Sequence, residues 1–447
     1  MKKIFFGALL TLCFYSSHLF AQWSQINLPL AKIQMGIAAY DEEVFMAGGN
    51  DGFYYSPKVD IYNLDKNEWT NASLSIARSF PVGLTLNNEI LFAGGYNTAS
   101  SDAVDIYNVY TKERKTAKLS EARFSIAALA YQHWALWAGG ANIENLTVTK
   151  RVDIYDQKNQ KWSVDSLSEA RCAMGFAILG GKAYFAGGYK FNNQVSDRVD
   201  IYDFESQTWE QDTLSLARGL LSAAVSGSQI IFAGGITADN KPTDQVDIYD
   251  TVTLSWSQSN LSVARAFIDN GASSCDKAFF VGGCYFDMSN NIEYRSFNIV
   301  DIYDASSKSW QRDSLPQFIL DNAVLATGNY VISAGGATNV LAPMTYSNIV
   351  NIYQCIPTST NSPANSDFLL LPNPCSDFLQ IQNVDLSFNH TYTAILYDIL
   401  GNQVFSKSLS DPSAQIDVKN IPNGLYFFVL RQNGQTKIQG KKMIIQH

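Results

Sequence analysis

The chain has few of the residues from which most catalytic and nucleic-acid sites are built. One of its four histidines, His133, lies between residues 22 and 355. Lysine and arginine total 32 against 41 aspartates and glutamates, which gives a net charge of −9. Because no basic surplus exists to neutralise phosphates, nucleic acid is not expected as a partner.

Long apolar runs are missing beyond the first residues. Lys2 and Lys3 precede an apolar run from Ile4 to Tyr15, and Ala21 stands at a position suited to cleavage. A charged start, a short apolar run and a small residue are typical of a secretory signal peptide, here residues 1–21. The run is shorter than the ~20 residues that a membrane-spanning helix needs. We therefore expect export, with no membrane span after signal removal.

Paired cysteines are also absent from the sequence pattern. The cysteines after the signal peptide are Cys172, Cys275, Cys284, Cys355 and Cys375. No C-x-x-C pair or histidine-rich partner accompanies this odd set, so no zinc site is expected. Cys275 and Cys284 lie at opposite ends of one predicted return strand, which argues against a bridge between them. Buried free thiols are the expected state.

Seven glycine pairs, each at the end of an apolar run, divide residues 22–355 into repeats. The pairs begin at Gly48, Gly94, Gly139, Gly187, Gly234, Gly282 and Gly335, with spacings of 46, 45, 48, 47, 48 and 53 residues. A Val-Asp-Ile-Tyr segment or a near copy follows each pair, and five repeats carry a tryptophan nine residues beyond its aspartate. Each repeat predicts four short strands, which cannot bury both faces alone. An all-β, seven-bladed propeller satisfies this requirement.

The two ends of the repeat region complement each other. The seventh repeat stops at Cys355 after its third strand, whereas residues 23–32 match Trp69 to Arg78 position for position. We therefore expect the N-terminal segment to supply the outer strand of the last blade and to close the ring.

The glycine pair, the following tyrosine, the spaced tryptophan and the arginine that opens the next repeat resemble the kelch repeat. The resemblance covers about three quarters of the chain. It implies a propeller but no single function, because kelch propellers include oxidases, isomerases and binding modules.

Residues 367–447 follow a polar linker, residues 356–366, and have a different pattern. Their short alternating strands predict a small, immunoglobulin-like β-sandwich. The Pro372-Asn373-Pro374 opening, the D-x-x-G-x-x-V segment from Asp398 to Val404 and the basic-then-apolar end resemble the type A C-terminal sorting domain of the Bacteroidota type IX secretion system. The resemblance implies the secretion machinery as a partner, and secretion or display on the outer cell surface. An ordinary ligand-binding sandwich is the alternative.

The sequence lacks residues that two familiar kinds of catalytic site require. A copper oxidase on this scaffold needs two histidine ligands, and a Ser-His-Asp hydrolase needs a G-x-S-x-G elbow, which does not occur. His133 is expected in a turn. No catalytic residue, cofactor or metal is expected, and a binding protein is favoured over an enzyme.

A basic residue opens each of the first six repeats. These residues are Lys32, Arg78, Arg123, Arg171, Arg218 and Arg265. They either ring one mouth of the channel, where they would attract an acidic peptide, or pair with the aspartates of the Val-Asp-Ile-Tyr segments. The seventh repeat favours pairing, because it lacks both charges and has Ile319 and Asn351 in these positions.

The sixth and seventh repeats depart most from the pattern, and a ligand site is expected there. Their inner strands carry Asp269-Asn270 and Asp321-Asn322, where other repeats have apolar or small residues, and their loops after the glycine pairs are the longest. The predicted site comprises Arg265, Asp269, Asn270, Asp321, Asn322, Tyr285 and Tyr294. Carboxylates and amides beside aromatic residues suit a glycan or a protein ligand. Solvated channel residues and tolerated insertions are the alternative.

Three functions are compatible with these patterns. The first is a secreted or surface-bound protein that binds a glycan or a protein. The second is a metal-independent carbohydrate isomerase of the mutarotase type, in which Asp269, Asp321 and Arg265 handle protons. The third is a structural or adhesion protein without a small ligand.

Overall fold

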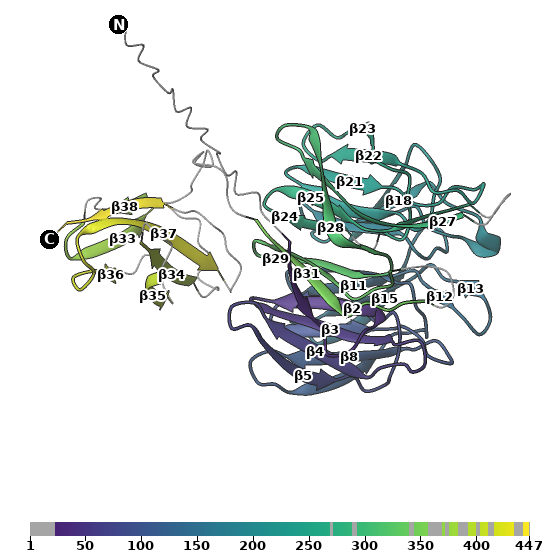
Figure 1. Ribbon diagram of the computed structural model, residues 1–447, viewed down its shortest axis with the longest axis horizontal. Helices are drawn as coiled ribbons and strands as arrows, with labels where there is room; N and C mark the ends of the chain where they lie inside the picture. Colours follow the sequence, from purple (N-terminus) through teal and green to yellow (C-terminus); the bar gives the residue numbers. More distant parts are fainter. Residues whose placement is uncertain are drawn as a thin grey trace, which may run out of the picture.

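The computed structural model describes residues 23–268, 271–287, 293–338, 344–355, 369–371, 375–382, 392–398, 403–409, 415–432 and 441–446. Within them, seven antiparallel sheets of four or five strands form a ring up to residue 355, in which the inner strands of successive sheets are in contact, and two further sheets form the C-terminal domain (Figure 1). The expected signal peptide and linker lie outside the described residues. The all-β prediction is confirmed.

Each blade orders its strands from the channel outward. Blade one comprises β2 (Ile33–Tyr40), β3 (Glu43–Asn50), β4 (Lys58–Asn63) and β5 (Glu68–Ser73). Blade two comprises β6 (Val82–Leu86), β7 (Glu89–Ala93), β8 (Ala103–Asn108) and β9 (Arg114–Lys118). Blade three comprises β10 (Ala127–Tyr131), β11 (Trp134–Ala138), β14 (Arg151–Asp156) and β15 (Lys161–Ser166). Blade four comprises β16 (Gly175–Leu179), β17 (Lys182–Ala186), β18 (Arg198–Asp203) and β19 (Thr208–Thr213).

The later blades repeat this order with additions. Blade five comprises β20 (Ser222–Ser226), β21 (Gln229–Ala233), β22 (Gln245–Asp250) and β23 (Ser255–Asn260). Blade six comprises β24 (Ala272–Ser274), β25 (Lys277–Val281), β27 (Glu293–Asp304) and β28 (Ser309–Ile319), and β26 (Cys284–Asp287) also pairs with β27. Blade seven comprises β29 (Ala323–Thr327), β30 (Tyr330–Ala334), β31 (Ile349–Gln354) and β1 (Ser24–Asn27). Loops add the hairpin β12 (Ala141–Asn142) and β13 (Thr147–Val148), and the 3-10 turn η1 (Phe191–Asn193).

The hydrophobic core of the propeller lies between neighbouring blades. Leu91 of β7, for example, packs in one cluster with Trp137 of β11. The outer edge is covered by the repeated tryptophan, which lies opposite the tyrosine of the third strand. The two ring centroids are 4.9 to 5.2 Å apart in six of the seven blades. Arg114 takes the place of the tryptophan in blade two, opposite Tyr107.

The glycine pairs join each blade to the next. The second glycine donates its N–H to the carbonyl oxygen of the residue that opens the following blade, as from Gly235 to Arg265 at 3.0 Å. The first glycine packs directly against that carbonyl: a Cβ on Gly234, where φ is +65°, would lie 2.6 Å from the oxygen of Arg265. This close approach explains why glycine recurs there.

Replacing Gly234 with alanine should therefore lower the free energy of unfolding by more than the strain of a positive φ alone explains. Gly180 is a matched control, because its φ is +61° and nothing lies within 4 Å of an added Cβ. We expect Gly180→Ala to reduce the free energy of unfolding by about 1–2 kcal/mol, and Gly234→Ala by a further ~1–3 kcal/mol from the clash. Denaturant unfolding of both variants measures the difference, and equal losses would contradict the role of the contact.

The N-terminal strand closes the ring as the sequence predicts. In β1, Ser24 lies opposite Ile352 and Ile26 opposite Val350 of β31. The Trp23 ring covers Tyr353 with centroids 5.2 Å apart. The chain then continues into blade one, where the Lys32 carbonyl accepts the N–H of Gly336 at 2.9 Å. Strand pairing thus connects the N-terminal segment to blade seven, and the glycine contact connects blade seven to blade one.

The C-terminal domain is a sandwich of two antiparallel sheets. One has the order β32 (Leu369–Leu371), β33 (Phe378–Gln382), β36 (Ile416–Asp417), and the other has the order β35 (Gln403–Leu409), β34 (Tyr392–Tyr397), β37 (Gly424–Gln432), β38 (Lys441–Ile445). Side chains of both sheets meet in one buried cluster that includes Leu379, Leu396, Phe428 and Met443.

Candidate binding site at the channel mouth

The basic residues that open the first six repeats are buried and paired within their own blades. Lys32, Arg78, Arg123, Arg171, Arg218 and Arg265 are each at most 1% exposed. Their ion pairs are with Asp60, Asp105, Asp153, Asp200, Asp247 and Asp301 respectively. The pairing alternative therefore describes these residues, and they do not form a charged ring at the channel opening.

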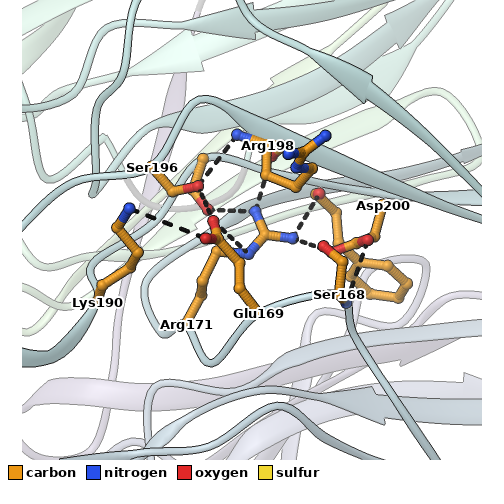
Figure 2. Close-up of polar contacts among 9 residues, drawn as sticks. Ser168, Glu169, Arg171, Lys190, Ser196, Arg198 and Asp200 are labelled. Atoms are coloured by element: carbon orange, nitrogen blue, oxygen red, sulfur yellow. Dashed lines mark hydrogen bonds and ion pairs between the residues drawn. The ribbon is translucent and has the colours of Figure 1, made fainter.

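Backbone carbonyls complete the surroundings of each guanidinium. Figure 2 shows Arg171 of blade four between Asp200 and Glu169. Its Nη1 also donates to the carbonyl oxygens of Gly187 and Arg198, at 2.6 and 2.7 Å. Burial lowers the pKa of the Arg171 guanidinium, and the negative charge of Asp200 opposes this change. Through these contacts Arg171 links the glycine pair to the third strand, so its role is structural.

The central channel forms a cavity of about 590 Å³ that all seven blades line. One residue of each blade, two positions beyond its opening residue, has a positive φ of 50–59° and is half-buried at the start of the inner strand. We call these seven residues the channel mouth: Gln34, Phe80, Ser125, Ala173, Leu220, Phe267 and Asp321. They lie on the same side as the glycine pairs, because the inner strand begins where the second strand ends.

A chain of hydrogen bonds reaches the channel mouth from blades one and two. Gln34 donates from Nε2 to Asp321 Oδ2 at 3.2 Å, and its Oε1 accepts from Asn50 Nδ2 at 2.9 Å. The same Asn50 amide donates to Ser79 Oγ at 2.9 Å. Asp321 is the one charged side chain among the described residues that line the cavity. Burial raises the pKa of its carboxyl group, and the bond from Gln34 opposes the rise.

Aromatic side chains lie beside this polar chain. Phe80 stacks on Tyr96 with ring centroids 5.9 Å apart, and Tyr96 meets the edge of Phe124 at 5.1 Å. Tyr55 adds a further edge contact to Tyr96 at 6.0 Å. Burial raises the pKa of Tyr96, with smaller contributions from Tyr55 and Asp321. We call Tyr55, Phe80, Tyr96 and Phe124 the aromatic cluster; all four are half-buried.

The structure brings few of the sequence-predicted site residues to the channel. Asp321 lines it, whereas Arg265 is buried against Asp301, 2.6 Å away. Asn322 is 1% exposed and donates to Ser333 Oγ at 2.9 Å. Asp269 and Asn270 lie outside the described residues.

The two predicted tyrosines lie on the hairpin that extends blade six. Tyr285 of β26 is opposite Arg295, and Tyr294 of β27 is opposite Phe286, although the side chain of Tyr294 is not among those described. Phe286 packs with Phe267 in an apolar cluster formed by residues of blades six, seven and one. The described part of the long loop in blade six thus contributes to packing.

The aspartates of the two irregular repeats stand at different positions in their repeats. Counted from the residue that opens each blade, Asp321 corresponds to Phe267 and to Gln34, not to Asp269. The sequence contains a signal for this alignment, because each of the seven channel-mouth residues stands two positions after the Lys, Arg or Ile that opens its blade. Gln34, Asn50 and the aromatic cluster were missed, because blades one and two look regular when their own repeats are read alone.

Other sequence-based expectations concern catalysis and membranes. His133 lies in the turn between β10 and β11, as predicted, with its Nε2 4.0 Å from Asp156 Oδ1. Among the described residues, no group of three or more His, Cys, Asp and Glu is placed to hold a metal ion. No helix in the described part of the chain has the length and apolarity to cross a membrane.

These features define a repeat-built β-propeller with an aromatic and polar channel mouth and a separate C-terminal sandwich. A family model for the Kelch motif matches residues 170–212, which span blade four, and a model for the secretion system C-terminal sorting domain matches residues 370–446. The protein is therefore a kelch-repeat protein with a type IX secretion sorting domain, destined for secretion or the cell surface. A search of the curated proteins found no match. The sorting domain makes the secretion machinery a partner.

Proposed function

We propose that the propeller binds a carbohydrate at the channel mouth. The observation that supports this most is the contact between the polar chain and the aromatic cluster, where Ser79 and Phe80 are adjacent. A sugar has hydroxyl edges that need amide and carboxyl partners, and C–H faces that pack on aromatic rings. Both kinds of partner lie here within neighbouring blades, beside a cavity of about 590 Å³.

A protein ligand is the second candidate, and one loop favours it. Phe53 and Tyr54, in the loop after the first glycine pair, are 88% and 77% exposed. They lie on the same side of the propeller as the channel mouth, and exposed aromatic residues are frequent anchors in protein interfaces. A protein that binds through them would depend on the loop rather than on Asp321.

The side chains at the cavity favour ligand binding over sugar isomerisation as the function. Proton exchange at a sugar needs an acid and a base within reach of the same substrate. The described residues bring one titratable carboxyl group, Asp321, to the cavity, and Arg265 is occupied by Asp301. Asp321 and Gln34 thus support a role as hydrogen-bonding partners of a bound ligand.

A glycan array with the mature chain, residues 22–447, tests the proposal. We expect Asp321→Ala and Phe80→Ala each to weaken binding of the best glycan by about tenfold or more, which corresponds to ~1.4 kcal/mol. Tyr110→Ala is the control, because this tyrosine is 68% exposed in the turn between β8 and β9, on the other side of the propeller. Asp269→Ala examines the part of the sequence-based site that lies outside the described residues.

Two results would contradict carbohydrate binding at this place. One is an array without any bound glycan, and the other is binding that none of the channel substitutions changes. Binding to a protein that is lost with Phe53→Ala but kept with Asp321→Ala would favour the second candidate. Turnover of a sugar anomer or epimer, followed by NMR, would establish an isomerase.

A further inference from the structure

Two cysteines that are 80 positions apart in the sequence meet at blades six and seven. The hydroxyl oxygen of Ser274 lies 3.7 Å from Cys275 Sγ and 3.6 Å from Cys355 Sγ. The two thiols therefore flank the same hydroxyl group. Cys284, the cysteine nearest to Cys275 in the sequence, lies beyond the far end of β25 and is buried in a different cluster.

Cys275 lies in a turn and Cys355 follows the last strand of blade seven, both on the side of the propeller opposite to the channel mouth. Cys275 and Asp276 form the two-residue turn between β24 and β25, with φ of +52° and +57°. Cys355 directly follows β31 and donates its N–H to the carbonyl oxygen of Asn329 at 2.8 Å. The Ser274 hydroxyl donates to the carbonyl oxygen of Gly328 at 3.1 Å and so connects Cys275 to the turn between β29 and β30, which contains Asn329.

The two sulfur atoms differ in access and acidity in a way that suits thiol–disulfide exchange. Cys275 is exposed, whereas Cys355 is 7% exposed, which corrects the expectation that all free thiols are buried. The neighbouring Cys355 thiol lowers the pKa of Cys275 to about 7, and Cys275 in turn raises the pKa of Cys355. An exposed cysteine with a pKa near neutrality is partly in the thiolate form, which is the form that attacks disulfides.

We propose that Cys275 and Cys355 form a disulfide bond in the exported protein and thereby tie the end of the last propeller strand to blade six. Export removes the chain from the reducing cytosol, which makes such a bond durable. Because the sorting domain follows Cys355 along the chain, the bond would also anchor the segment through which that domain is attached.

The oxidant that the step needs is a disulfide, either of low molecular weight or on a thiol oxidase. The Cys275 thiolate attacks one sulfur of this disulfide, forms a mixed disulfide and releases the first thiolate. Cys355 then loses its proton, and its thiolate attacks the Cys275 sulfur and releases the second thiolate. Two cysteines are oxidised, one oxidant disulfide is reduced, and the two protons pass to the released thiolates.

Counting thiols in the wild-type chain tests the proposal. The mature chain, residues 22–447, is incubated with oxidised glutathione, quenched with acid and alkylated in guanidinium. We expect three alkylated cysteines after oxidation, namely Cys172, Cys284 and Cys375, against five in the reduced chain. Peptide mapping should show Cys275 joined to Cys355, about 2 Da below the sum of the two peptides.

Variants and stability supply independent checks. Cys284→Ser should keep the cross-linked peptide, and Cys275→Ser should lose it. Because the bond closes a long loop, oxidation should raise the thermal midpoint of the wild-type propeller by several degrees and leave that of Cys275→Ser unchanged. Five alkylated thiols after prolonged oxidation, or glutathione retained on Cys275 with Cys355 still free, would overturn the proposal.

Discussion

An Arg218→Ile chain should unfold with a free energy about 3–5 kcal/mol smaller than that of the wild type, the usual cost of removing one partner from a buried ion pair. Arg218 is 0% exposed, and its Nη1 lies 2.8 Å from Asp247 Oδ2. Its Nη2 also donates to the carbonyl oxygen of Phe232 at 3.1 Å. The substitution leaves the Asp247 carboxylate buried without its cation.

Blade seven provides the design of the compensating variant. It folds with Ile319 and Asn351 in the two positions, and Asn351 is 0% exposed. We therefore expect Arg218→Ile combined with Asp247→Asn to recover most of the loss, because no unpaired charge then remains buried. Guanidinium unfolding followed by tryptophan fluorescence reports on the propeller, since all eight tryptophans lie between residues 23 and 310.

An exposed ion pair serves as the control for this experiment. Arg151 lies 3.1 Å from Glu121, and both side chains are about two fifths exposed. Arg151→Ile should therefore change the free energy of unfolding by about 1 kcal/mol or less. If the single and double variants at Arg218 and Asp247 lost the same free energy, the charge would not be the cause of the instability.

Removing the first strand should have an effect of comparable or larger size. A chain that starts at Lys32 loses Trp23, which is 7% exposed, and Leu28, which is 2% exposed. Truncating a buried leucine costs about 2–5 kcal/mol and a tryptophan about 3–5 kcal/mol. Together these losses approach the ~5–15 kcal/mol that holds a typical domain folded. They also leave β31 as an open edge, which favours association between chains.

Light scattering and the thermal midpoint of the shortened chain measure both consequences. We expect a lower midpoint and species larger than a monomer. A peptide of residues 22–31, added in trans, should restore the monomer, because it supplies the missing outer strand. The same peptide with Trp23→Ser and Leu28→Ser is the control and should not restore it. A shortened chain that stays monomeric with the wild-type midpoint would contradict the role of β1 in closing the ring.

Repetition explains why so much of the fold could be predicted. The glycine pairs, the Tyr–Trp pairs and the match between residues 23–32 and Trp69 to Arg78 each report a local environment that recurs. The joint change to Ile319 and Asn351 also indicated the buried ion pairs, because two charges that vanish together are expected to be partners. The fold can be predicted from these patterns without knowing which residues of distant blades lie close together.

The candidate site was harder to predict, because it depends on contacts between different blades. Gln34 and Asp321 are 287 positions apart and meet because the ring closes between their blades. Cys275 and Cys355 meet at the junction of blades six and seven for a related reason. The irregular seventh repeat indicates Asp321, but no irregularity marks Asn50 or Tyr96, whose own blades follow the common pattern.

The pairing of β1 with β31 also sets the order in which the molecule can be completed. Gln25 and Asn351 are 326 positions apart, yet their side chains bond at 2.8 Å in the final blade. During synthesis the residues of β1 emerge first and those of β31 emerge after six other blades. The outer strand of the last blade therefore has no partner until the propeller sequence is complete. A chain intercepted before that point lacks the strand pairing that closes the ring, so the contacts between β1 and β31 are among the last that the propeller can form.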